Sequence, residues 1–162
     1  MTALFPIEER VRFARNIDPV CNAYLQEAAA SPQAERAEAL LNKAARFAPD
    51  ALAVDVARYK FYFYRGDLRA AERIVRVTLA KAASQGAFDP DWRRHHQPLD
   101  GRTETEGPQR HYLYALKALA FIRLRLGAND EALAILQTLQ CLDPDDLTGA
   151  SVVAELAAGL ED

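Results

Sequence analysis

Apolar residues recur every three to four positions through most of this chain, which is the spacing of helices that bury one face. The segment 33–47 shows it most clearly, with a stripe formed by Ala37, Leu40, Leu41, Ala44 and Ala45. No stretch alternates apolar and polar residues for long between turn residues, so strands have little support. The pattern therefore predicts an all-α chain.

Turn and capping residues divide this pattern into separate helices. Asp18 before Pro19 and Asp67 after Gly66 are suited to capping the helices that follow them. We expect an opening helix that ends near Asn16, followed by helices at about 19–30, 33–47, 51–64, 68–83, 111–126, 131–141 and 147–160. The last of these is expected to cap the C-terminal side of the helical array.

The segment 84–110 differs from the rest because it has no sustained periodicity. It contains three glycines and three prolines, namely Gly86, Pro90, Pro98, Gly101, Gly107 and Pro108. Long loops without secondary structure are uncommon in compact domains and are often functional or mobile. We therefore treat 84–110 as a 27-residue insertion between helices.

Small residues recur at matched intervals in the helical part of the chain. Ala37 and Ala71 lie 34 residues apart, and Ala132 follows Ala71 by 61 residues, which is 34 plus the 27 of the insertion. Gly66 and Gly127 each precede one of these alanines by five residues. A fixed period near 34 residues predicts stacked helix–turn–helix units, in which small side chains let two helices approach closely.

These residues resemble the tetratricopeptide repeat family. Pro49 and Pro144, twelve residues after Ala37 and Ala132, close two of the units because a helix cannot run through proline. The third unit matches best, through Leu116, Leu119, Ala120, Gly127, Ala132, Leu136 and Pro144. The resemblance implies an α-solenoid of about three helix pairs, with an opening helix, a C-terminal capping helix and the insertion between pairs two and three.

The composition narrows the function classes. At 162 residues, 50% hydrophobic and 9% aromatic, the chain 1–162 is expected to fold as a single domain. A net charge of −3 argues against nucleic acid as a partner, since such binding needs an excess of cations on one face. No run of 18 apolar residues is present, and charged residues interrupt the segment 1–13, so neither a membrane span nor a signal peptide is expected.

Cysteine usage adds a little about the compartment. Cys21 and Cys141 form no CxxC pair, which fits two buried, reduced thiols in a cytoplasmic protein. The alternative is a single disulfide between them. We therefore expect the protein to be located in the cytoplasm.

The family resemblance implies that the first helix of each pair lines a concave groove. Mapped onto this sequence, the candidate groove residues are Asn22, Gln26, Lys60, Tyr64, Lys117, Phe121 and Arg125. Cationic and aromatic side chains in such a groove suit a peptide or helix that carries acidic and apolar groups. The alternative is that these are ordinary solvated helix residues.

The insertion carries a second set of binding candidates, Trp92, Arg93, Arg94, His95 and His96. Tryptophan and arginine are favoured at binding hot spots, so this loop is a candidate contact for a partner. The alternative is a tethered loop in which Trp92 fills an apolar gap.

Metal or catalytic chemistry has weaker support. The possible ligands in and near the insertion are His95, His96, His111, Asp89, Asp91 and Asp100. No HxxxH or HExxH spacing is present, and neither a GxSxG motif nor a glycine-rich phosphate loop occurs. We expect no cofactor, no bound metal and no enzyme activity.

Together these observations predict a cytoplasmic protein-interaction module, an adaptor or scaffold that binds a peptide or helix of another protein and is a monomer or small homo-oligomer. One alternative is a small chaperone of the bacterial secretion type for a specific partner. A less favoured alternative is a metal-binding protein or enzyme that uses the histidine and aspartate residues of 89–111.

Overall fold

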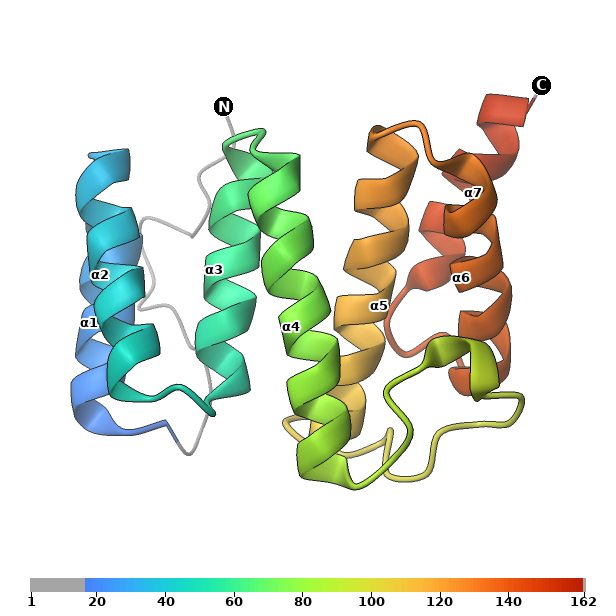
Figure 1. Ribbon diagram of the computed structural model, residues 1–162, viewed down its shortest axis with the longest axis horizontal. Coiled ribbons are helices and arrows are strands. Elements are labelled where there is room, and N and C mark those ends of the chain that lie inside the picture. The colour runs from blue at the N-terminus through green and yellow to red at the C-terminus, as the bar shows by residue number, and fades with distance from the viewer. Residues whose placement is uncertain (1–16, 162) are drawn as a thin grey trace. The chain divides into compact units, whose positions relative to one another are not determined.

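The computed structural model describes residues 17–161, and Figure 1 shows their helices. Within that range the chain forms seven α-helices and one short 3-10 helix, without strands, so the predicted all-α class is confirmed. The predicted opening helix lies outside the described residues. The helices are α1 (Pro19–Ala30), α2 (Ala34–Phe47), α3 (Leu52–Tyr64), α4 (Leu68–Gly86), η1 (Trp92–Arg94), α5 (Pro108–Arg125), α6 (Asn129–Leu142) and α7 (Ala150–Glu161).

The chain divides into two compact units, Met1–Ile74 and Val75–Asp162, with the boundary inside α4. Each unit contains one hairpin of adjacent antiparallel helices, α1–α2 in the first and α5–α6 in the second. Whether the two units together form the single domain expected from the sequence stays a prediction.

The first unit is built on the apolar stripe of α2. Ala37, Leu40, Leu41 and Ala44 are buried and face Leu25 and other apolar residues of α1. Helix α3 packs on α2 and adds Val54, Ala57 and Phe61 to the same cluster. Asp18 caps α1 as predicted, since its Oδ1 accepts a hydrogen bond from Val20 N at 2.8 Å.

The second unit is centred on α5, in which eight residues between Tyr112 and Leu124 are buried. Leu113, Leu116 and Leu119 on this helix are completely buried. Helix α6 packs along α5, α7 contacts both of them, and η1 lies against α6. Ala132, predicted to allow close helix approach, is completely buried at the start of α6.

The turns that end α3 and α5 have the same hydrogen bonds, 61 positions apart. Asp67 N donates to Tyr62 O and Ala128 N donates to Arg123 O, both at 2.9 Å. Gly66 and Gly127 both have φ of +82°, a left-handed conformation that glycine adopts without strain. The predicted turn glycines therefore end two helices in the same way.

The connections that follow α2 and α6 also begin alike, 95 positions apart. Ala48 N donates to Ala44 O at 2.9 Å, and Asp143 N donates to Leu139 O at 2.8 Å. Ala48 has φ −132° and ψ 74°, and Asp143 has φ −131° and ψ 65°. The two connections share a backbone shape at the point where each helix stops before proline.

Some helix ends differ from the prediction. Helix α4 continues to Gly86 rather than ending at 83, and α5 begins at Pro108 rather than 111, because proline fits the first turn of a helix. The segment outside α-helices is therefore shorter than 84–110. Helix α7 begins at Ala150 instead of 147, directly after Gly149, whose φ of +73° lies outside the right-handed helical region.

Two further sequence expectations concern membrane spans and the state of the cysteines. Among the helices described here, none is long and apolar enough to cross a membrane. Cys21 is buried and Cys141 is exposed, and both are free thiols. The expectation that both thiols are buried is therefore wrong for Cys141.

Candidate functional site

The groove candidates of the first unit lie on α1 and α3. Asn22 and Gln26 are half-buried one turn apart on α1, where Gln26 Nε2 donates to Asn22 Oδ1 at 3.3 Å. Lys60 and Tyr64 are exposed one turn apart on α3, and Tyr64 is 61% exposed at the end of the helix. The exposed surface at this end of α3 is therefore basic and aromatic.

The groove candidates of the second unit lie along one side of α5, but they differ in accessibility. Lys117 is half-buried, and its Nζ donates to Thr148 O at 2.7 Å, which ties α5 to the segment before α7. Phe121 is half-buried, and Arg125 is exposed at the last position of the helix. Lys117 therefore has a structural contact inside the chain, and Arg125 is the more accessible cation.

Lys117 belongs to a polar network that the sequence analysis missed. The buried Asp143 carboxylate accepts hydrogen bonds from Leu147 N at 2.9 Å, Thr148 N at 3.0 Å and Thr148 Oγ1 at 2.8 Å. These bonds hold Leu147 and Thr148 in a turn before the last helix. Gly149 follows with φ of +73°, a left-handed conformation that a right-handed helix does not contain, so α7 begins at Ala150 and not at 147 as predicted.

Asp146 caps the first turn of α7. Its carboxylate accepts hydrogen bonds from Ser151 N at 3.1 Å and from Ser151 Oγ. These bonds to Ser151 lower the pKa of Asp146, with a smaller contribution from the nearby Lys117 cation. The sequence did not indicate this role, because adjacent aspartates between two helices are also typical of an exposed helix end.

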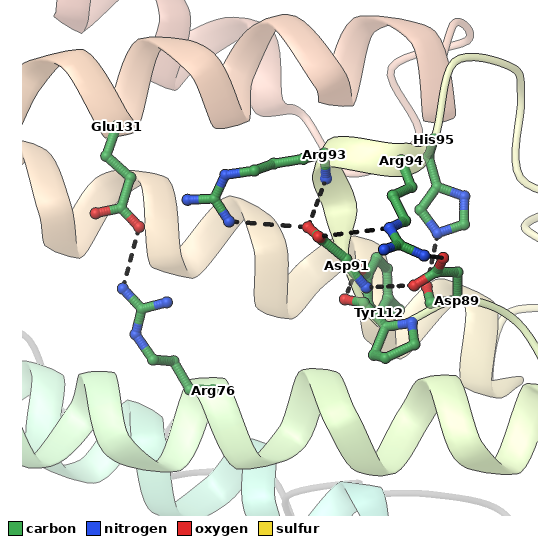
Figure 2. Close-up of polar contacts among 9 residues, drawn as sticks. Arg76, Asp89, Asp91, Arg93, Arg94, His95, Tyr112 and Glu131 are labelled. Atoms are coloured by element: carbon green, nitrogen blue, oxygen red, sulfur yellow. Dashed lines mark hydrogen bonds and ion pairs between the residues drawn. The ribbon is translucent and has the colours of Figure 1, made fainter.

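Two aspartates and then two arginines follow one another at the start of the loop after α4, and their side chains pair (Figure 2). Asp91 caps η1 by accepting a hydrogen bond from Arg93 N at 3.0 Å. The Asp91 carboxylate lies 3.8 Å from Arg93 Nη1 and 4.0 Å from Arg94 Nε, and Asp89 lies 3.6 Å from Arg94 Nη1. The two arginines stay mostly exposed, but each already has an acidic partner, so this part of the loop is close to neutral.

Trp92 is 7% exposed, on the short helix η1 that packs against α6. The Arg93 guanidinium covers its ring at 4.3 Å from the centroid. This burial matches the alternative in which Trp92 fills an apolar gap. The tryptophan therefore holds the loop on α6 and does not present a free anchor.

His95 is part of an aromatic cluster that anchors the loop. Its ring centroid lies 6.0 Å from that of Phe88 and 6.2 Å from that of Tyr112, and its Nε2 is 2.7 Å from Asp89 O. The buried Tyr112 hydroxyl donates to Pro90 O at 2.7 Å. Burial raises the pKa of Tyr112, and Asp91 and Asp89 raise it further, so the phenol remains protonated.

A partly open pocket of about 520 Å³ lies beside this cluster. Its polar lining comes mainly from the loop and the start of α5, namely Arg94, His95, His96, Gln97, Asp100 and Gln109. His96 is exposed, whereas His95 is directed into the aromatic cluster. The two neighbouring histidines therefore lie in different environments.

The possible metal ligands of the loop do not form a site in the part of the chain that the structure describes. Within residues 17–161, no three histidine, cysteine, aspartate or glutamate side chains are grouped so that they would hold a metal ion. Asp89 and Asp91 are instead engaged with the loop arginines. These contacts favour a structural role for the loop over a role in metal binding.

The comparisons with known proteins found one significant relative among curated proteins. The chain is 32% identical over 125 residues to the "Uncharacterized 19.8 kDa protein in nifW 5'region" of Azotobacter chroococcum mcd 1, an alignment that covers 75% of this chain and 70% of that protein. No protein-family model matches the chain. No solved structure matches it significantly.

Proposed function

The chain belongs to the same family as the Azotobacter chroococcum protein, and we propose that it is a protein-binding module built from tetratricopeptide-like helix pairs. Its role is to hold a peptide or helix of another protein against the first helices of these pairs. The proposal is that of an adaptor or scaffold, with no chemistry of its own.

The observation that carries this proposal is the recurrence of two turn types. The turns at Gly66 and Gly127 share their hydrogen bonds and their left-handed glycine, and the connections at Ala48 and Asp143 share theirs. Repeated turns at fixed offsets support a repeat of helix pairs, because each pair must be closed by the same backbone geometry. Modules of this kind present extended surfaces and usually act by binding.

The accessible surface of the first helices suggests the chemistry of the partner. Lys60 and Tyr64 are exposed on α3, and Arg125 is exposed on α5 one turn beyond the half-buried Phe121. Each unit thus offers a cation next to an aromatic ring. We infer a partner segment that carries acidic groups for the cations and apolar side chains for the rings.

An array of synthetic peptides that combine acidic and apolar residues tests this proposal. We expect the wild-type protein to bind a subset of the array, and Lys60→Glu or Arg125→Glu to lose that subset because each reverses a charge on a first helix. Arg46→Glu and Arg73→Glu make the same change at exposed positions on the second helices α2 and α4, and serve as matched controls.

Two outcomes would contradict the proposal. Either the wild-type protein retains no peptide, or all four charge-reversed variants lose binding to the same extent. The second result would show a non-specific response to net charge instead of contact with the first helices.

A further inference from the structure

The pocket beside the aromatic cluster contains a carboxamide that is held in place by packing. Gln109 lies in the first turn of α5 and lines this pocket. A Cβ atom on Gly101 would come within 2.9 Å of Gln109 Cδ and within 3.2 Å of both Oε1 and Nε2. The carboxamide of Gln109 therefore lies flat over Gly101, closer than a side chain at position 101 would allow.

Two other glycines bound the same carboxamide. A Cβ atom on Gly86, the last residue of α4, would lie 3.1 Å from Gln109 Nε2 and 2.5 Å from Phe88 Cε1. A Cβ atom on Gly107 would lie 3.4 Å from Gln109 Oε1. The end of α4, the loop and the start of α5 thus hold one side chain between them. Because this side chain is already ordered, a ligand that bonds to it loses little affinity to side-chain entropy.

The hydrogen-bonding groups of this pocket are not used inside the chain. Four polar residues that line it make no hydrogen bond or ion pair through their side chains within residues 17–161, namely His96, Gln97, Asp100 and Gln109. Of these, Gln109 is half-buried. Its carboxamide carries a donor and an acceptor side by side, so it can form two parallel hydrogen bonds with a ligand edge that carries the same pair.

The charges of the pocket favour an uncharged ligand. Arg94 lines it, but its guanidinium already lies 3.6 Å from Asp89 and 4.0 Å from Asp91. The Asp100 carboxylate has no such partner among the described residues, and the positive end of the α5 dipole offsets part of its charge. Because a carboxylate only accepts hydrogen bonds, the ligand must bring donors to Asp100. Hydroxyl groups provide these donors without adding charge.

The remaining wall is apolar and partly aromatic. Phe88 and Pro98 line the pocket, and the Phe88 ring is fixed by an edge-to-face contact with Tyr112 at 5.0 Å between centroids. A flat heterocycle gains contact area on such a wall. The volume of about 520 Å³ lies in the range of small-molecule sites.

We propose that this pocket binds an adenine nucleoside that carries no phosphate. Gln109 donates from Nε2 to N7 of the base and accepts at Oε1 from its N6 amino group, a pairing that a glutamine carboxamide makes with adenine. Asp100 accepts a hydrogen bond from a sugar hydroxyl, and the base packs on Phe88. This small-molecule site is separate from the peptide-binding residues proposed on the first helices.

A titration with adenosine, followed by proton–nitrogen correlation NMR, tests the proposal. We expect adenosine to shift the backbone amide signals of residues 94–101. Purine riboside, which lacks the N6 amino group, should bind about ten-fold more weakly because one hydrogen bond to Gln109 is lost. Gln109→Met keeps the length of the side chain without its polar edge, so it should bind both compounds equally weakly. Gln137→Met, at an exposed position on α6, is the matched control and should keep the preference for adenosine.

A second pair of variants tests whether the packing of Gln109 matters. Gly101 and Gly127 have left-handed backbones, with φ of +86° and +82°, so alanine strains both positions alike. An added Cβ presses on Gln109 only at Gly101, since nothing lies within 4 Å of one at Gly127. Gly101→Ala should therefore weaken adenosine binding several-fold, whereas Gly127→Ala should bind as the wild type does. Circular dichroism verifies that both variants keep their helix content.

The contributions of sugar and phosphate are measured with adenine and adenosine monophosphate. The wild-type protein should bind adenosine several-fold more tightly than either compound, and Asp100→Ala should lose the preference for adenosine over adenine. Asp130→Ala, at an exposed aspartate of α6, is the control and should retain it.

Three results would overturn the proposal. They are no adenosine binding at millimolar concentration, equal binding of adenosine and purine riboside by the wild-type protein, and tighter binding of adenosine monophosphate than of adenosine. None of these measurements involves Lys60 or Arg125, so the peptide-array test of the first helices stands or fails independently.

Discussion

The connection between α2 and α3 and the connection between α6 and α7 start with one backbone shape and continue differently. In the first, Ala48 and Ala53 occupy the positions that Asp143 and Thr148 occupy in the second, 95 residues later. The first connection leads directly into α3 and contributes apolar side chains to the core. The second holds a buried carboxylate with three hydrogen bonds, and the left-handed Gly149 separates it from the start of α7.

Helices α1 and α5, each the first helix of a hairpin, also differ in how they contact the rest of the chain. Asn22 in α1 stands 95 positions before Lys117 in α5, but it bonds within its own helix to Gln26. Lys117 instead reaches Thr148 O and bridges two elements. The comparison shows that the repeat spacing determines where the chain turns, whereas side chains specific to each unit determine how the next helix is attached.

Asp143→Ala is expected to have the largest effect on this difference. It makes the second connection resemble the first at Ala48, but leaves buried donors of Thr148 without their acceptor, and should lower the free energy of unfolding by about 1.5–3 kcal/mol. Urea denaturation followed by circular dichroism measures the change. Asp145→Ala is the matched control, because this carboxylate is exposed and pairs with Arg102 at 3.3 Å, so its loss should cost less than about 1 kcal/mol.

The double variant Asp143→Ala/Thr148→Ala sharpens the same prediction. It reproduces both residues of the first connection and removes the Thr148 hydroxyl that the single variant leaves unpaired, so it should recover part of the lost stability. A double variant less stable than Asp143→Ala would show that the hydroxyl contributes through packing and not through its bond to Asp143.

The helix positions followed from the sequence because they depend on local rules. Apolar spacing located all seven described α-helices, and Asp18 caps the first of them as predicted. Gly66 and Gly127 were recognisable as turn residues because few other residues adopt a left-handed backbone so readily. These features need only neighbours in the sequence.

The polar attachment of α7 could not be predicted in the same way. Lys117 and Thr148 are 31 residues apart, so no local pattern links them. The same holds for Trp92, whose burial depends on how the loop lies on α6. Whether Lys60, Tyr64, Phe121 and Arg125 contact a partner stays a prediction, because a binding role depends on a molecule outside the chain.

Lys117→Met is expected to have an intermediate effect. Methionine keeps most of the apolar stem but removes the ammonium that bonds Thr148 O at 2.7 Å, so the free energy of unfolding should fall by roughly 0.5–1.5 kcal/mol. Asn22→Met makes a comparable change at the corresponding position of the first unit, where no such bridge exists, and should cost less. Equal losses in the two variants, measured by urea denaturation, would show that the bridge to Thr148 adds nothing.

The smallest expected effect is a pH dependence carried by Asp146. Its pKa is lowered in the folded protein by the hydrogen bonds from Ser151, so its ionised form stabilises the fold at every pH above the ordinary aspartate value of about 3.9. This stabilisation is lost as the pH falls through the lowered pKa of the folded state. Asp146→Asn cannot ionise and should lack this component, so the difference in urea midpoint between wild type and variant should be larger at pH 6 than at pH 2.5.

Ser151→Ala should raise the pKa of Asp146 toward its ordinary value, which a nuclear magnetic resonance titration of the carboxyl group detects. Midpoints of wild type and Asp146→Asn that change in parallel with pH would mean that Asp146 caps α7 without any linkage to its charge, and would leave Asp143 as the acidic side chain that distinguishes this connection from the one at Ala48.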